Sequence, residues 1–232
     1  MLGDCGLSEG VVVKISGKII NPSNISVVKN YSLKLARLWE EGVLKAVVVG
    51  GGEISRSFIR AVKELGASKS LQDLVGLEAS RLNARLLIAG LWPRAYPEPP
   101  RSIHEVLRAF STGKLVVCGG LQPAQSTATV AAIIAELLDA SKLVLASTVN
   151  GVYNSDPREN PQAKLLKKIT YSELERVLSS SLEPGRYELL DPYATSILRR
   201  SKITTHVVNG FDPENVVRAS RGEEIGTLIY EP

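Results

Sequence analysis

The stretch VVVGGGEISRSF, Val47 to Phe58, sets three glycines between a run of valines and an amphipathic segment. The valines predict a buried strand, and apolar residues at helical spacing from Ile54 to Leu65 predict a helix that ends at Gly66. A strand that ends in glycines and leads into a helix presents backbone N–H groups at the positive end of the helix dipole. Such a loop suits an anion, above all a phosphate.

The rest of the chain repeats this alternation of short apolar runs and amphipathic segments. Strands are predicted at residues 11–15, 43–49, 115–118, 143–146, 204–208 and 227–230, and further helices at residues 25–41, 71–87, 102–111 and 129–140. The alternation argues for a mainly parallel sheet with helices on both faces. Beyond residue 150 the chain becomes polar and rich in turns. We therefore expect one domain, residues 1–232, with two lobes, 1–146 and 147–232.

The second half carries three signals for the start of a helix. Thr170 and Glu173 match a capping box, in which each residue satisfies a backbone N–H of the other. Asp191 and Asp212 are each followed by proline, the pattern of an aspartate N-cap with proline at the first helical position. We expect helices to begin at these three places.

Two other loops resemble the triple glycine in position and composition. KISGK, Lys14 to Lys18, follows the first predicted strand, and GGLQPAQSTAT, Gly119 to Thr129, follows another. In doubly wound sheets ligands bind beyond the carboxyl ends of the strands, so the three loops can converge on one polyphosphate site. The dinucleotide-binding motif G-x-G-x-x-G is disfavoured, because Ser55 occupies the position of its last glycine.

Composition excludes several other classes of protein. The net charge is only +4, and the pairs of adjacent basic residues are not interleaved with aromatic residues. No nucleic-acid partner is therefore expected. No apolar run reaches the ~18 residues of a membrane span, and the first residues do not form a signal peptide, so we expect a cytoplasmic protein without a membrane partner. Cys5 and Cys118 are the only cysteines, and His104 and His206 are isolated. No metal site made of protein residues is predicted.

The side chains of the three loops indicate the kind of reaction. The loops contain no histidine that could take a proton from an alcohol acceptor. A phosphate monoester needs less help, because its second pKa is about 6 and it is largely a dianion at neutral pH. Repulsion between two anions then becomes the obstacle, which cationic groups and a metal ion relieve. Lys14, Lys18 and Arg56 supply the cations, and we expect Lys14 and Arg56 to be catalytic.

Taken in order, six segments resemble one known family. KISGK, VVVGGGEISR, LQDLVGLEASRLNA, CGGLQPAQSTATVAA, STVNGVYNSDP and YELLDPYA are similar to the archaeal type of uridylate (UMP) kinase, in the amino acid kinase superfamily. The resemblance extends over essentially the whole chain. It implies an α/β fold, an open αβα sandwich with a mainly parallel central sheet. It also implies MgATP-dependent phosphoryl transfer to UMP, giving UDP, in pyrimidine nucleotide biosynthesis, and a homohexamer.

The resemblance also implies roles for particular residues. The expected ATP contacts are Lys14, Ile15, Ser16, Gly17, Lys18, Gly52, Arg56, Ser147, Thr148, Tyr153 and Asp156. The expected UMP contacts are Gly51, Asp73, Leu121, Gln122, Pro123, Ala124, Gln125, Ser126 and Thr127. Among these, Asp73 would bind the ribose hydroxyls and the two glutamines the uracil, while Ser126 and Thr127 would donate to the UMP phosphate. Magnesium would arrive with ATP, and no protein ligand is assigned to it.

Two departures from the family pattern and two rival functions remain open. Asn150 stands where relatives commonly have aspartate, which leaves a turn role but no charge there, and Ala128 stands where many have an acid. One rival is another small-molecule kinase of this fold, acting on isopentenyl phosphate, carbamate or acetylglutamate. The other is a nucleotide-binding or storage protein without turnover.

Overall fold

The computed structural model of the chain is organised around a seven-stranded sheet, and it describes residues 10–155, 160, 162–180 and 189–232. The strand order is β3-β2-β1-β4-β6-β7-β5. The strands are β1 (Val11–Ile15), β2 (Leu44–Val49), β3 (Val116–Cys118), β4 (Lys142–Ser147), β5 (Lys168–Thr170), β6 (Thr204–Asn209) and β7 (Thr227–Tyr230). Among the strand pairs of the described residues, only β6–β7 is antiparallel. The mainly parallel sheet predicted from the sequence is therefore confirmed.

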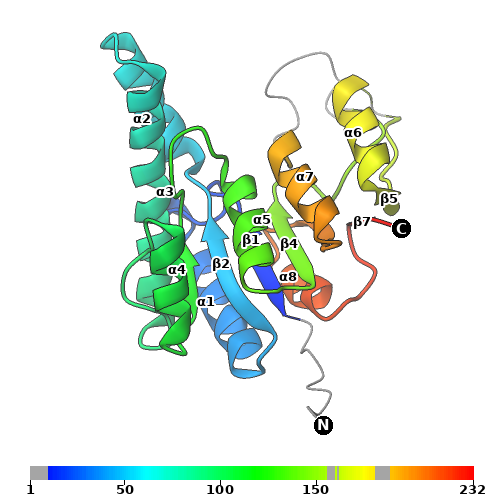
Figure 1. The fold of residues 1–232 in the computed structure, drawn as a ribbon, viewed down its shortest axis with the longest axis horizontal. Helices are drawn as coiled ribbons and strands as arrows, with labels where there is room; N and C mark the ends of the chain where they lie inside the picture. The colour runs from blue at the N-terminus through cyan, green and yellow to red at the C-terminus, as the bar shows by residue number, and fades with distance from the viewer. Residues whose placement is uncertain (1–9, 156–159, 161, 181–188) are drawn as a thin grey trace.

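Helices cover both faces of this sheet (Figure 1). One hydrophobic layer lies under α1 (Ile25–Glu40), α3 (Lys69–Leu91) and α8 (Pro213–Ser220); the other lies under α4 (Ile103–Ser111), α5 (Thr127–Leu137), α6 (Tyr171–Ser180) and α7 (Pro192–Arg200). Strand β1 divides between them, because successive side chains point to opposite faces. Val11, Val13 and Ile15 join the first layer and Val12 the second. No helix in the described ranges combines the length and apolarity needed to cross a membrane.

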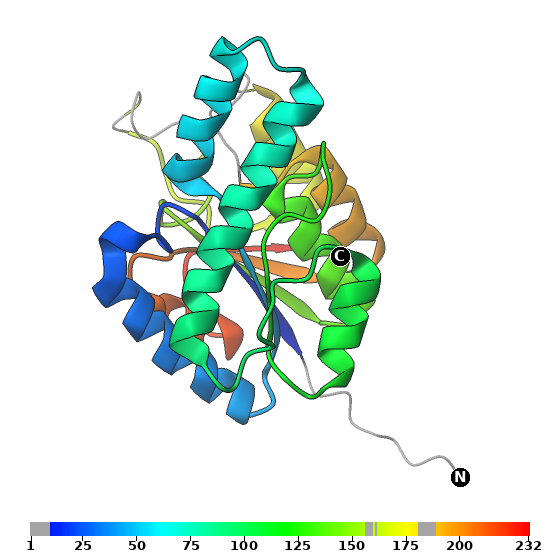
Figure 2. The same cartoon turned by 90° about the vertical axis from the view of Figure 1, so that its left-hand side faces the viewer.

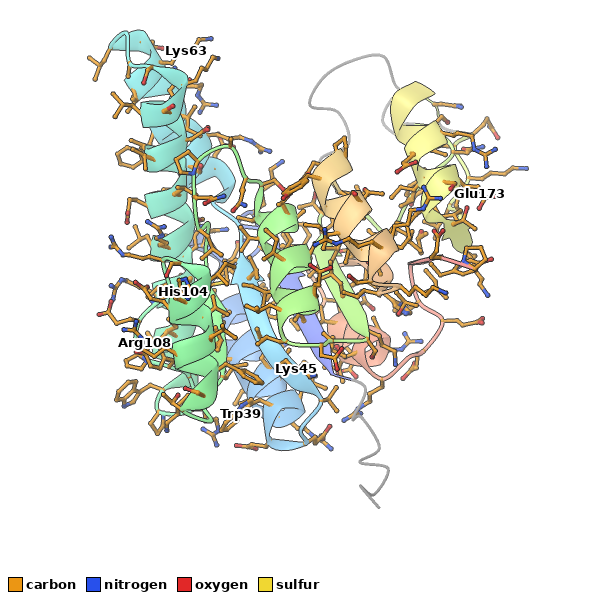
Figure 3. The ribbon with its side chains drawn as sticks, viewed as in Figure 1. Trp39, Lys45, Lys63, His104, Arg108 and Glu173 are labelled. Carbon is orange, nitrogen blue, oxygen red and sulfur yellow. The ribbon has the colours of Figure 1, made fainter. Side chains whose placement is uncertain are left out.

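Helix α2 (Gly52–Glu64) differs from the others because none of its residues is buried. It packs along α3, and the two form a hairpin that projects beyond the sheet (Figures 1 and 2). Lys63 lies near its tip (Figure 3). Helix α3 is longer than the predicted 71–87: it begins after Ser68, which caps it, and its buried apolar residues continue to Leu91.

The three predicted helix starts are all present. The Thr170 N–H donates to Glu173 Oε2 at 2.7 Å, and the Glu173 N–H donates to Thr170 Oγ1 at 3.2 Å, so the capping box is formed. Asp191 and Asp212 cap α7 and α8, each with proline in the first turn. Strand β5 was not predicted. It has three residues, of which only the central one is buried, so it carries almost no pattern in the sequence.

Candidate active site

The KISGK segment, Lys14 to Lys18 (the lysine loop), and the triple-glycine loop, Gly50 to Gly52, touch through their backbones at the carboxyl ends of β1 and β2. The Gly50 N–H donates to the Ile15 carbonyl oxygen at 2.9 Å. A Cβ atom at Gly17 would lie 2.2 Å from the Gly50 carbonyl oxygen and 2.4 Å from the Gly52 nitrogen. Gly52 itself has φ +62°, which favours glycine. Two of the three predicted loops thus meet because both lack side chains at the point of contact.

The predicted cationic residues lie on the elements that form this contact or directly beside them in the chain. Lys14 lies on β1, next to its end, on the same face as Val12. Lys18 is exposed just beyond the strand, and Arg56 lies on the second turn of α2, 4.0 Å from Glu53. Ser16 ties the lysine loop to β4, because its N–H donates to the Ala146 carbonyl oxygen at 2.9 Å. The lysine loop therefore sits between the triple glycine and the end of β4.

A cavity of about 490 Å³ opens beside the triple glycine. Its walls come from α2, α3 and the loop between β3 and α5. The lining includes Gly51, Asp73, Gln122, Pro123, Ala124, Gln125, Ser126 and Thr127, together with Ser55, Ile59, Gly76, Leu77 and Ser80. All the residues expected to contact UMP are thus brought together except Leu121, which is 7% exposed and packs in the core.

Asp73 contacts the loop that faces it across this cavity. Its Oδ2 atom accepts a hydrogen bond from the Ala124 N–H at 3.0 Å. Ala124 has φ +62°, a left-handed conformation that is costly for a residue with a Cβ. The carboxylate therefore holds a strained turn of the loop, in addition to the ribose role expected of it.

Asp191 reaches the same loop from the second half of the chain. Besides capping α7 it accepts hydrogen bonds from the hydroxyls of Ser126 and Thr129, the latter at 2.8 Å. Burial raises the pKa of the Asp191 carboxyl, but the hydrogen bonds from Ser126, Ala194, Thr129 and Tyr193 outweigh it and leave the pKa below its ordinary value. An ionised carboxylate thus joins the first turns of α5 and α7. The sequence predicted only its capping of α7.

Three buried polar residues of α3 hold the glycine-rich backbones. The Asn83 side-chain amide donates to the carbonyl oxygens of Gly50 and Gly51 at 2.9 and 3.1 Å. Arg81 donates to the carbonyl oxygens of Gly120 and Leu121, both at 3.0 Å, and Ser80 Oγ accepts from the Gly120 N–H at 2.7 Å. Sequence reasoning missed these residues. The available signal was polar side chains on the face of a helix that is otherwise apolar.

The residues expected to contact ATP on the second lobe lie beyond the end of β4. Ser147 ends that strand, and its carbonyl oxygen accepts from the Gly210 N–H at 2.8 Å. Thr148 follows, and Tyr153 is half-buried and paired with Leu165 in an isolated bridge. Asn150 Oδ1 accepts from Asn209 Nδ2 at 2.9 Å, so this side chain binds the last residue of β6. Asp156 lies outside the described residues.

Metal-ligating and nucleophilic groups do not gather near the site in the described part of the chain. It holds no cluster of three or more His, Cys, Asp or Glu side chains arranged for a metal ion. His104 is exposed on α4 (Figure 3), and His206 is buried in β6. Burial raises the pKa of the Cys118 thiol to about 12, so this cysteine is an inert core residue. Cys5 lies outside the described residues.

Known proteins are similar to this chain over nearly its whole length. The model of the amino acid kinase family matches residues 9–209. A uridylate kinase of Hyperthermus butylicus is 56% identical over 94% of this chain and 97% of its own, and one of Methanobrevibacter smithii is 39% identical over 94% and 98%. The crystal structure of a uridylate kinase from Archaeoglobus fulgidus superimposes with a TM-score of 0.86 at 32% identity, covering 95% of this chain and 99% of that one. The chain belongs to the amino acid kinase family.

Proposed function

We propose that the protein is a UMP kinase, which transfers the γ-phosphoryl group of MgATP to UMP and releases UDP and ADP. The observation that carries the proposal is the backbone contact between the lysine loop and the triple glycine, directly beside the polar cavity. The relatives that match this chain over almost all of its length are named uridylate kinases, which supports the same substrate.

The chemistry follows from what this backbone offers. The UMP phosphate binds at Gly51 and at the first turn of α5, where Thr127 adds a hydroxyl group to the helix dipole. The Ser126 hydroxyl, expected from the sequence to donate to this phosphate, instead donates to Asp191 and caps α5. The ATP phosphates bind on the lysine-loop side. An oxygen of the UMP phosphate attacks the γ-phosphorus in line, and the bond to the bridging oxygen of ADP breaks. Lys14 and Arg56 neutralise charge on the transferring group, and no general base is required.

The remaining assignments concern recognition and the metal. The two glutamines of the loop bind uracil and Asp73 binds the ribose hydroxyls, while Tyr153 covers the adenine or its ribose. Residues 1–146 form the UMP lobe and residues 147–232 the ATP lobe. The carboxylates nearest the cavity, Asp73 and Asp191, already accept protein hydrogen bonds. Magnesium is therefore carried by the ATP phosphates and water as part of the substrate MgATP.

An assay of ADP release from MgATP with a panel of acceptors tests the proposal. The panel is UMP, CMP, dUMP, isopentenyl phosphate and no acceptor. The polar lining of the cavity favours UMP, since a hydrocarbon chain would make no hydrogen bond with the side-chain amides of Gln122 and Gln125. A faster reaction with isopentenyl phosphate than with UMP would overturn the assignment of UMP as the acceptor. Nucleotide binding without UDP formation would instead favour a binding protein.

A substitution in the lysine loop tests the mechanism. Lys14→Ala removes the charge that steers the phosphoryl group, and turnover should fall roughly 10²-fold or more. Lys63→Ala is the matched control, because it removes an ammonium group at the projecting tip of α2 (Figure 3). A folded Lys14→Ala protein with wild-type turnover would remove Lys14 from the mechanism.

We further propose that the protein assembles as a homohexamer, and that the α2–α3 hairpin forms one of its contacts. Phe58 and Leu82 are 56% and 59% exposed. Both line a second cavity, of about 310 Å³, together with the apolar residues Ile54, Val75, Ala79 and Pro99 and the charged residues Glu78, Arg81, Arg85 and Arg101. An apolar patch of this kind on a soluble protein marks an interaction surface. Leu82→Glu should lower the mass measured by light scattering, whereas Leu33→Glu, a single exposed leucine of α1, should not. An unchanged mass for Leu82→Glu would contradict the contact.

A further inference from the structure

We propose that Asn83 and Arg81 of α3 are positioning residues, which hold the two glycine-rich loops of the site in their binding orientation through their carbonyl groups. The inference rests on the proposed function for the identity of the ligands. Both side chains are buried in the middle of a long helix, where Asn83 is 1% and Arg81 9% exposed. Each donates to two consecutive carbonyl oxygens of a loop that faces the helix.

Asn83 sets the direction of the N–H groups of the triple glycine. A trans peptide unit is planar, so its N–H and C=O groups point in opposite directions. Because the carbonyl oxygens of Gly50 and Gly51 face Asn83, the N–H groups of Gly51 and Gly52 point away from it. These are the donors at the start of α2, and Gly51 lines the cavity. With the carbonyls held, the N–H groups stay available to a phosphate.

The need for such a residue follows from the glycines themselves. A run of glycines populates more backbone conformations than any other sequence, so its peptide units can flip. A flipped unit would turn a carbonyl oxygen toward the phosphate, where it repels the anion. The Asn83 amide opposes the flip, because each flipped unit would leave one donor of this buried side chain without its acceptor. The loop thus gains a fixed orientation that its own residues cannot provide.

Arg81 fixes the root of the acceptor loop, the segment from which residues 122–127 extend. Its Nε donates to the Gly120 carbonyl oxygen and its Nη2 to that of Leu121, while Nη1 pairs with Glu78 at 2.7 Å. Ser80 accepts from the Gly120 N–H, so both backbone polar groups of Gly120 are held by α3. A planar guanidinium with donors in fixed directions suits two neighbouring carbonyls better than a lysine ammonium would. A shift of this root would displace every residue that contacts the acceptor.

The two roles predict different kinetic effects. The root of the acceptor loop lies on the UMP side, so loss of Arg81 should weaken the binding of UMP and leave the binding of ATP unchanged. The triple glycine serves both nucleotides, so loss of Asn83 should lower kcat. A misplacement of about 1 Å can reduce a rate 10²-fold, so effects of roughly 10-fold to 10²-fold are expected in each case.

The test compares Arg81→Met, Arg81→Lys and Asn83→Ala with the wild-type chain. Arg108→Met is the control, because it makes the same change at an exposed arginine of α4 (Figure 3). Calorimetric titration with UMP gives its Kd without turnover, and steady-state assays give kcat and both KM values. Arg81→Met should raise the Kd and KM for UMP about 10-fold or more, and leave the KM for ATP within about twofold. Arg81→Lys should recover part of the loss, and Arg108→Met should match the wild type.

Several results would overturn the inference. The first is an unchanged UMP affinity in a folded Arg81→Met protein. The second is an equal loss of affinity for UMP and ATP in that variant, and the third is an Asn83→Ala protein with wild-type kcat. If Arg81→Met does not fold, Ser80→Ala removes one contact of the same root. This variant must then raise the Kd for UMP while leaving the KM for ATP nearly unchanged. If the wild type binds UMP but forms no UDP, the kinase assignment fails while the Kd values still test the positioning role. If it does not bind UMP, titration with inorganic phosphate tests the triple-glycine backbone in Asn83→Ala.

Discussion

Replacing Gly17 with alanine is the sharpest test of the contact between the lysine loop and the triple glycine. The added Cβ would lie 2.2 Å from the Gly50 carbonyl oxygen and 2.4 Å from the Gly52 nitrogen. Both are backbone atoms, so no side chain can swing away to make room. The lysine loop and the triple glycine must therefore move apart.

The size of that movement follows from van der Waals contact. A carbon atom and a backbone oxygen rarely approach closer than about 3.2 Å, so the loops must separate by about 1 Å. Overpacking of this kind costs about 2 kcal/mol of unfolding free energy. For a chain of this length that corresponds to a fall in melting temperature of about 4–8 °C. The same displacement at the reacting phosphates should lower turnover about 10²-fold.

The assay measures ADP release and thermal unfolding for Gly17→Ala beside Gly113→Ala. Gly113 also lies in a connecting turn, with φ +71° and no heavy atom within 4 Å of an added Cβ. Alanine there carries backbone strain of about 1 kcal/mol and no collision, so it should lower stability and leave kcat unchanged. A Gly17→Ala protein with wild-type melting temperature and turnover within twofold of the wild type would refute the argument that these two backbones form the site.

Three further outcomes are expected. Asp191→Asn should destabilise the protein at neutral pH. Because the folded-state pKa is depressed, the difference from the wild type should persist above pH ~4 and vanish as the pH falls through that lowered pKa, which urea unfolding from pH 7 to 3 would detect. In a Cys5→Ser variant, Cys118 should not react with a thiol reagent until the protein unfolds, since burial raises the pKa of its thiol; a stoichiometric reaction in the native state would contradict this. Asp73→Ala should raise the KM for UMP about 10-fold or more through loss of the ribose contact and of the bond to Ala124, with little change in the KM for ATP; equal changes in both would argue against this role.

Much of the fold was predictable from local patterns. The apolar run 11–15 marked a strand, the glycines after Val49 marked the end of a strand before a helix, and Asp212 before proline marked a helix start, because each pattern reflects the conformation of a few adjacent residues. Strand β5 was missed because its three residues gain their strand geometry from pairing with β7, not from their own sequence.

The sequence by itself determined the alternation of strands and helices, the buried faces, and the glycines that leave room for one backbone against another. Only the tertiary structure decided which polar side chains serve the loops. Asn83 lies 33 residues from Gly50, and Asp191 lies 65 residues from Ser126. Such contacts depend on how α3 and α7 pack against the sheet, and packing geometry is set by the assembled core and not by local propensity. A buried polar residue in a helix therefore signals that a partner exists, while the fold alone determines what that partner is.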